Sequence, residues 1–207
     1  MKGIIFDLDG TLLDTIGDIA AAMNKALQIH NLPTHTIKEY ENYIGNGAKI
    51  LAERASGGIK TEEVFTDYIK IYSNANDIKT KPFPGIEKCL SILSETHFLA
   101  VLSNKPHNDT KNIVKKYFPD IHFSAVCGQR PEIPTKPDPA AAAEILHIIN
   151  IPISDFIFVG DSPEDIMTGK ALGMKTAGVN WGYRSEIQLK NAGADIIIKT
   201  TEELIQL

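Results

Sequence analysis

The chain opens with Met1-Lys-Gly-Ile-Ile-Phe-Asp7-Leu-Asp9-Gly-Thr11, a short apolar run followed at once by two aspartates and a Gly-Thr pair. A continuous apolar run of this length predicts a strand that is buried on both faces of a parallel sheet. Ligands of open α/β sheets bind beyond the carboxyl ends of such strands. Carboxylates as close as Asp7 and Asp9 repel one another unless a cation or a shared proton compensates. The alternative is a plain turn, since Asp and Gly are turn residues.

Composition narrows the class of protein. The 207 residues suffice for one core, or for a core and a small accessory domain. A net charge of −5 argues against nucleic acid as a partner, because proteins that bind it usually carry a basic patch. No apolar run approaches the roughly 20 residues of a membrane span, and the first predicted strand leaves no room for a signal peptide. Cys89 and Cys127 lie in apolar stretches without metal-binding spacing, so we expect free thiols in a reducing cytoplasm.

Two zones of the chain differ in pattern. Residues 14–77 show helical spacing and no convincing strand, with apolar residues at Ile16, Ile19, Met23 and Leu27 in the first helix. Further helices are predicted at 37–43, 50–54 and 64–72. This zone therefore predicts a small helical bundle.

Beyond Pro82, Pro84 and Gly85, strand and helix patterns alternate. Strands are predicted at 98–102, 123–127, 156–159, 176–179 and 196–198, and helices at 108–117, 139–149 and 163–172. Such alternation predicts a parallel, doubly wound α/β sheet that also holds the strand at 4–6. We expect a Rossmann-like core of residues 1–14 and 83–207, with an all-helical cap domain of residues 15–82 inserted after the first strand.

Three more polar motifs lie at the ends of predicted elements. They are Ser103-Asn104-Lys105 after a strand, Lys136 just before a helix, and Gly160-Asp161-Ser162-Pro163-Glu164-Asp165 after another strand. A doubly wound sheet brings them to one edge, next to Asp7 and Asp9. Carboxylates suit Mg²⁺, while a lysine and a hydroxyl suit phosphoryl oxygens. Because aspartate can also act as a nucleophile, the set predicts phosphoryl transfer.

These four motifs, in this order, resemble those of the haloacid dehalogenase-like phosphatase superfamily, and the resemblance spans nearly the whole chain. Within the superfamily the chain is similar to phosphoglycolate phosphatases, which share the segment Ile44-Gly45-Asn46-Gly47-Ala48 and the Ser/Thr-Asn-Lys and Lys-Pro-x-Pro forms of two motifs. The resemblance implies that Asp7 is the nucleophile and Asp9 the general acid and base. It also implies that Ser103 binds the phosphoryl group and that Lys136 restrains Asp7.

The same resemblance implies a Mg²⁺ cofactor held by Asp7, the backbone carbonyl of Asp9 and Asp161, with Asp165 orienting metal-bound water. Movement of the cap would be allowed at Gly10 and Thr11. The residues expected to contact substrate are Thr11, Gly45, Asn46, Gly47, Asn104 and Lys105. For Lys105 two interpretations stay open, a solvated surface position and a contact with a substrate carboxylate; for Trp181 they are the rim of the site and packing.

The expected function is hydrolysis of a small phosphorylated metabolite, with 2-phosphoglycolate as the leading substrate, by a monomer or homodimer. Alternatives within the superfamily are a sugar phosphatase, an inorganic pyrophosphatase and a β-phosphoglucomutase. The mutase is disfavoured because Ala48 and Lys49 stand where an arginine is expected. A phospho-acceptor signalling domain uses similar residues but needs no large helical insertion. A serine hydrolase around Ser162 is disfavoured because no histidine lies in a plausible partner motif.

Overall fold

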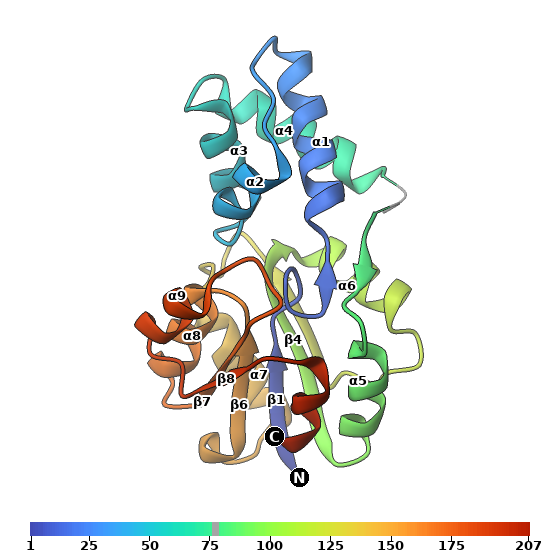
Figure 1. Ribbon diagram of the computed structural model, residues 1–207, viewed down its shortest axis with the longest axis vertical. Helices are drawn as coiled ribbons and strands as arrows, with labels where there is room; N and C mark the ends of the chain where they lie inside the picture. Colours follow the sequence, from blue (N-terminus) through green and yellow to red (C-terminus); the bar gives the residue numbers. More distant parts are fainter. Residues whose placement is uncertain (76–78) are drawn as a thin grey trace.

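The computed structural model describes residues 1–75 and 79–207, and its centre is a six-stranded sheet in which every neighbouring pair is parallel (Figure 1). The strand order is β5-β4-β1-β6-β7-β8. The strands are β1 (Lys2–Phe6), β4 (His97–Pro106), β5 (Ala125–Gln129), β6 (Phe156–Gly160), β7 (Lys175–Val179) and β8 (Ile196–Ile198). The predicted doubly wound parallel sheet is confirmed. The chain leaves β1 toward β4 and leaves β6 toward β7, so the crevice between β1 and β6 is the expected ligand position.

Helices cover both faces of the sheet (Figure 1). They are α5 (Ile86–Ser94), α6 (His107–Tyr117), α7 (Ala140–Ile149), α8 (Pro163–Ala171) and α9 (Glu186–Asn191), with short 3₁₀ helices η1 (Ile153–Asp155) and η2 (Thr201–Gln206). Because successive strand residues point to opposite faces, Ile4 and Phe6 of β1 join one apolar cluster and Ile5 joins the other. Burial on both faces explains why β1 is apolar throughout.

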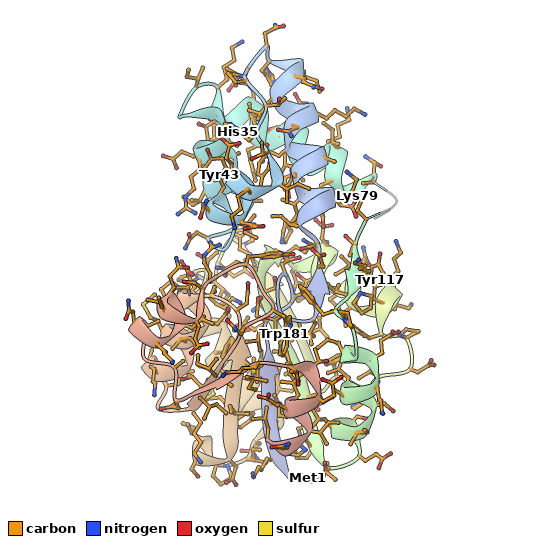
Figure 2. The ribbon with its side chains drawn as sticks, in the orientation of Figure 1. Met1, His35, Tyr43, Lys79, Tyr117 and Trp181 are labelled. Carbon is orange, nitrogen blue, oxygen red and sulfur yellow. The ribbon has the colours of Figure 1, made fainter. Side chains whose placement is uncertain are left out.

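Four helices form a second unit, which we call the helical cap. They are α1 (Ile16–Ile29), α2 (Ile37–Tyr43), α3 (Ala48–Ser56) and α4 (Thr61–Ser73). The helical cap has an apolar cluster of its own, in which Met23, Leu27, Tyr40 and Val64 are fully buried. It lies beyond the carboxyl ends of the strands, with His35 and Tyr43 inside it (Figures 1 and 2). The bundle expected from helical spacing is therefore present.

The chain passes between the two units through a small ribbon, β2 (Leu13–Asp14) paired antiparallel with β3 (Lys81–Pro82). Asp18, in the first turn of α1, accepts hydrogen bonds from the backbone N–H groups of Lys79 and Thr80 and from the Thr80 hydroxyl. No strand was predicted at these positions, since two residues are too few to show alternation. Residues 76 and 77, the end of the predicted helical zone, lie outside the described residues.

Other boundaries differ from expectation in informative ways. The strand expected at 98–102 runs on to Pro106, with a register shift against β5 after Leu102, so Ser103, Asn104 and Lys105 lie within the strand. The strand expected at 123–127 begins two residues later, at Ala125. In the part of the chain that the structure describes, no helix is both long and apolar enough to cross a membrane.

Helices α5 and α9 were absent from the sequence prediction. The pattern of α5 was nevertheless present, since Ile86, Cys89, Leu90 and Leu93 are spaced for one helix face, and all four are buried against the sheet. The helix begins directly after Gly85, whose φ of 86° favours glycine.

Candidate active site

A cavity lies between the carboxyl edge of the sheet and the helical cap. From the sheet unit it is lined by acids, amides, hydroxyls and cations, namely Asp7, Asp9, Ser103, Asn104, Lys105, Asp109, Lys136, Asp161, Ser162, Tyr183 and Arg184, together with Pro106. From the helical cap and the loop before α3 it is lined by Ile19, Ile44, Gly45, Gly47, Ala48, Leu51, Tyr68, Ile69 and Tyr72. The structure thus brings together most of the residues that the motifs predicted.

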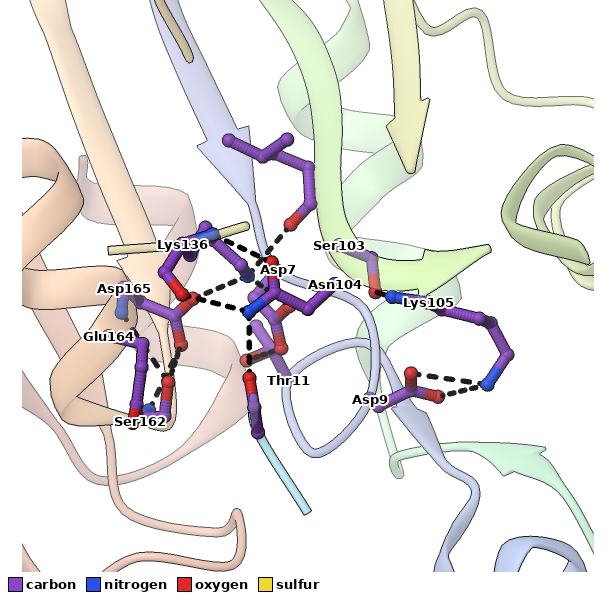
Figure 3. Close-up of polar contacts among 12 residues, drawn as sticks. Asp7, Asp9, Thr11, Ser103, Asn104, Lys105, Lys136, Ser162, Glu164 and Asp165 are labelled. Carbon is purple, nitrogen blue, oxygen red and sulfur yellow. Dashed lines mark hydrogen bonds and ion pairs between the residues drawn. The ribbon is translucent and has the colours of Figure 1, made fainter. Parts of the chain in front are cut away.

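Lys136 joins two aspartates at the centre of the site (Figure 3). Its Nζ lies 2.6 Å from Asp7 Oδ1, 2.6 Å from Asp165 Oδ1 and 3.0 Å from the carbonyl oxygen of Leu102. Burial alone would lower the pKa of Lys136, but Asp165 and Asp7 outweigh it and raise that pKa above its ordinary value. Lys136 therefore stays charged and fixes the direction of the Asp7 carboxylate.

Asp7, Asp161 and Asp165 form a buried acidic cluster, each with a carboxylate oxygen within 4.8 Å of the others. Burial raises the pKa of Asp7 well above its usual range, and burial together with the Asp165 charge raises the pKa of Asp161 to about 7. Lys136 supplies one positive charge against three carboxyl groups. When the three are ionised, the cluster has an excess of negative charge that a divalent cation would offset. Carboxylate oxygens are the ligands that Mg²⁺ prefers, so the residues fit that ion.

The three acids differ in how their oxygens are used. Asp165 is fully buried, and Ser162 donates to its Oδ2 from both the backbone N–H (3.0 Å) and the hydroxyl (2.6 Å). This is one half of a capping box that starts α8. With Lys136 on the other oxygen, Asp165 is suited to hold its neighbours in place. Asp7 and Asp161 are the acids better placed to hold a metal ion.

Close backbone packing shapes the pocket around Asp161. A Cβ on Gly10, where φ is 97°, would lie 2.3 Å from Asp161 Oδ2, and a Cβ on Gly182 would lie 2.2 Å from Asp161 Cβ. The Asp161 Oδ2 atom accepts the backbone N–H of Tyr183 at 2.7 Å. Only glycine fits at these two positions without displacing the acid.

Asp9 occupies a different environment from Asp7. Its carboxylate lies 3.1 and 3.2 Å from Lys105 Nζ, apart from the Lys136 group (Figure 3), and accepts the Thr15 hydroxyl at 2.7 Å. Its side chain is 19% exposed, whereas that of Lys105 is 5% exposed. Burial lowers the pKa of Lys105, but Asp9, Tyr72 and Tyr68 raise it well above its ordinary value. Lys105 is therefore a buried cation inside the cavity, which excludes the solvated surface position.

Some predicted contact residues have other partners. The Asn104 side chain donates to the backbone carbonyl of Lys136 and accepts the backbone N–H of the same residue. It also donates to the Gly45 carbonyl at 2.8 Å, so it tethers the loop before α3 to the sheet. Asn46 donates to Glu164 at 2.8 Å and accepts from Arg54, and it is not among the residues that line the cavity. The Thr11 hydroxyl, also outside that lining, lies 3.4 Å from Asp7 Oδ2.

Ser103, Gly45 and Gly47 do line the cavity. The Ser103 hydroxyl is buried and accepts the backbone N–H of Lys105 at 3.2 Å. Gly45 and Gly47 have φ values of 113° and 88°, a region that favours glycine. Since neither has a side chain, they line the cavity with their backbone.

In the loop after β7 the sequence had pointed to Trp181 only, and the roles of its neighbours Tyr183 and Arg184 were missed. The Tyr183 hydroxyl accepts the backbone N–H groups of Thr15 (2.9 Å) and Ile16 (3.2 Å) at the start of α1. Arg184 donates to the carbonyl oxygens of Glu41 and of Ile44, the latter at 2.7 Å. The available signal was only the position of this loop after a predicted strand.

Trp181, in the same loop, lies over the sheet unit (Figure 2). It packs partly buried against the apolar cluster of that unit, and its indole N–H donates to the Thr11 carbonyl at 3.0 Å. Of the two interpretations left open for Trp181, the structure favours packing.

Comparison with known proteins gives one consistent answer. The sequence profile of the haloacid dehalogenase-like hydrolases matches residues 4–179. A phosphoglycolate phosphatase of Aquifex aeolicus is 33% identical, over 100% of this chain and 96% of its own length. One from Haemophilus influenzae is 30% identical, over 100% of this chain and 97% of its own length.

A solved structure agrees with these relatives. The crystal structure of a predicted phosphoglycolate phosphatase from Haemophilus somnus superposes with a TM-score of 0.91 at 27% identity, covering 100% of this chain and 97% of that one. The profile match alone includes all four motifs, from Asp7 to Asp165. The chain therefore belongs to the haloacid dehalogenase-like hydrolase family, as an enzyme of the phosphatase kind.

Proposed function

We propose that this enzyme is a Mg²⁺-dependent phosphatase that hydrolyses a small phosphate monoester through an aspartyl-phosphate, with 2-phosphoglycolate as its leading substrate. The observation that carries the proposal is the contact of Lys136 with Asp7 and Asp165 in the cavity that Asp161 also lines. The relatives named phosphoglycolate phosphatase support the choice of substrate.

In the first half of the reaction, an Asp7 oxygen attacks phosphorus and the bond between phosphorus and the ester oxygen breaks. Asp9 gives its proton to that departing oxygen, so an alcohol leaves. In the second half, Asp9 takes a proton from water, which attacks the phosphorus of the aspartyl-phosphate and regenerates Asp7. The two acids are held apart from each other by different partners: Asp7 is held by Lys136, and Asp9 lies by Lys105 and the Thr15 hydroxyl.

Electrostatic stabilisation comes from groups fixed before the substrate arrives. Lys136 neutralises charge next to Asp7, and the Ser103 hydroxyl is within the same cavity to bind a phosphoryl oxygen. The side chains of Asp7 and Asp161 and the backbone carbonyl of Asp9 would hold Mg²⁺, with Asp165 and Ser162 supporting them. When bound, the ion would neutralise the charge of the phosphoryl group and of the acids around it.

We also place the enzyme in the cytoplasm. Cys89 and Cys127 are both buried free thiols, which suits a reducing compartment.

A panel of phosphate esters assayed with Mg²⁺ tests the proposal. We expect 2-phosphoglycolate to give the highest kcat/KM, above sugar phosphates and pyrophosphate. A sugar phosphate or pyrophosphate at the top would reassign the substrate, and interconversion of sugar phosphates without release of phosphate would indicate a mutase. Absence of turnover of any ester would refute the proposal as a whole.

A further inference from the structure

Among the described residues, every side chain that the helical cap contributes to the cavity is uncharged. A positively charged side chain that binds an anion on the leaving side of the substrate must therefore come from the sheet unit. Three cations line the cavity from that unit: Lys136, Arg184 and Lys105. Which of them can bind a second anion decides what kind of leaving group the enzyme selects.

Lys136 and Arg184 are already committed to other groups. Lys136 bonds Asp7, Asp165 and the Leu102 carbonyl, which uses all three of its donors. Arg184 donates to backbone carbonyls of the helical cap through both of its terminal nitrogens. Lys136 has no donor left for a substrate. Arg184 keeps three further N–H groups, but it cannot turn toward a substrate without breaking its attachment to the helical cap.

Lys105 differs, because its carboxylate partner is the catalytic acid itself. Its Nζ is nearly equidistant from both oxygens of Asp9, at 3.1 and 3.2 Å, so it already binds a carboxylate side-on. The ammonium lies 4.6 Å from the centre of the Tyr72 ring, which also stabilises a cation. With a 5% exposed side chain, Lys105 would be left as a buried, poorly compensated charge if Asp9 turned away and nothing replaced it.

We propose that Lys105 selects substrates with a carboxylate beside the phosphate, and that this carboxylate takes the place of Asp9 on the Lys105 ammonium. The exchange leaves Asp9 free to turn to the ester oxygen. A substrate without the anion offers Lys105 no replacement, so Asp9 stays bound to the lysine and turnover is slow. This inference rests on the proposed phosphatase function and adds the residue that recognises the leaving group.

The test compares 2-phosphoglycolate with its neutral carboxamide in the Lys105→Met variant, which keeps the length of the side chain and removes the charge. For 2-phosphoglycolate we expect kcat/KM to fall by about 100-fold, since a buried partner of the charge is lost. For the carboxamide we expect kcat/KM to rise by roughly threefold over that of the wild type, because the lysine no longer holds Asp9. Lys105→Arg should retain part of the preference, and Lys115→Met, at an exposed lysine of α6, should retain all of it.

Binding gives a second readout that does not depend on turnover. In an Asp7→Asn background, calorimetric binding of 2-phosphoglycolate should weaken by about 100-fold on adding Lys105→Met, whereas binding of the carboxamide should be unchanged. Equal losses for both ligands, in rate or in binding, would overturn the selection role and leave Lys105 as a support for Asp9. If the wild type hydrolyses no ester, the proposed function itself fails; if it hydrolyses both compounds equally, only this inference fails.

Discussion

The two walls of the cavity are built from opposite kinds of residue. The sheet wall holds the buried acidic cluster with Lys136 in contact with two of its members, and the Asp9–Lys105 pair lies beside them. The cap wall, as far as the described residues show, consists of aliphatic side chains, glycines and two tyrosines. The difference shows that the cap contributes apolar surface to the cavity, while every described charged side chain that lines it comes from the sheet unit. Mutations on the two walls should therefore fail in different ways.

The largest expected loss of activity comes from Asp7→Asn on the sheet wall. Because Asp7 is the proposed nucleophile, we expect kcat to fall by about 10⁴-fold or more. Circular dichroism should show an intact fold, since the amide has the same shape and removes one of three crowded acids. Asp120→Asn, at an exposed acid far along the chain, is the matched control. Ordinary turnover by the Asp7 variant would remove it from the nucleophile role.

Removal of the metal should cause the second largest loss of activity. Excess EDTA should reduce activity by about 10³-fold, and added Mg²⁺ should restore it, because the three buried acids outnumber the charge of Lys136. Mg²⁺ should also raise the melting temperature of the wild type and have a much smaller effect on Asp161→Asn. Hydrolysis that is indifferent to EDTA would contradict the assignment of a metal to this wall.

The acidic cluster also predicts how stability depends on pH without metal. Burial raises the pKa of Asp161 from 3.8 to about 7. A carboxyl group with a raised pKa in the folded state holds its proton more tightly there, so its contribution is present below the unfolded pKa and is lost as pH rises through the folded one. With EDTA present, the free energy of unfolding should therefore decline between about pH 4 and pH 7, by up to about 4 kcal/mol from this group.

Urea denaturation of the wild type and of Asp161→Asn across that range would measure this effect. The variant should lack the component of the decline that belongs to Asp161, and Mg²⁺ should suppress it in the wild type. A difference between the two proteins that does not change with pH would count against a raised pKa at Asp161.

The smallest effect is expected where the two walls are joined. Arg184→Gln removes the charged donors to Glu41 and Ile44 of the helical cap and leaves the acidic cluster intact. We expect KM to rise about three- to tenfold with little change in kcat, since hydrogen bonds from a charged group contribute about 1.5–3 kcal/mol and water replaces part of this. Arg130→Gln, which removes an ion pair with Glu144, serves as the control. A fall in kcat larger than the rise in KM would move Arg184 into the reaction itself.

The sheet wall was largely predictable from sequence because local patterns determine it. Asp7 and Asp161 follow short apolar runs that are typical of buried parallel strands, and parallel strands bring their carboxyl ends together. The capping box is likewise local, because Ser162 and Asp165 are only three positions apart. Each of these features is set by the chain within a few positions of the residue concerned.

The joins between the two units were not predictable in the same way. Arg184 meets the Ile44 carbonyl across 140 positions of sequence, and Asn46 meets Glu164 across 118. Such contacts depend on how the cap sits on the sheet, which no local periodicity encodes. Lys105 was undecided for the same reason, since its burial depends on Tyr72, in α4, and on Asp9, in the loop after β1.

The ribbon of β2 and β3 has a mechanical consequence. A unit attached by one strand can swivel in any direction, whereas one attached by two hydrogen-bonded strands is stiff against twisting and bends mainly about a single axis. Asp18 fastens the returning strand to the first turn of α1, so both attachments move together with that helix. Thr15, one residue beyond β2, gives its hydroxyl to Asp9. A swing of the cap about this ribbon would therefore change the contact between Thr15 and Asp9, the proposed proton donor.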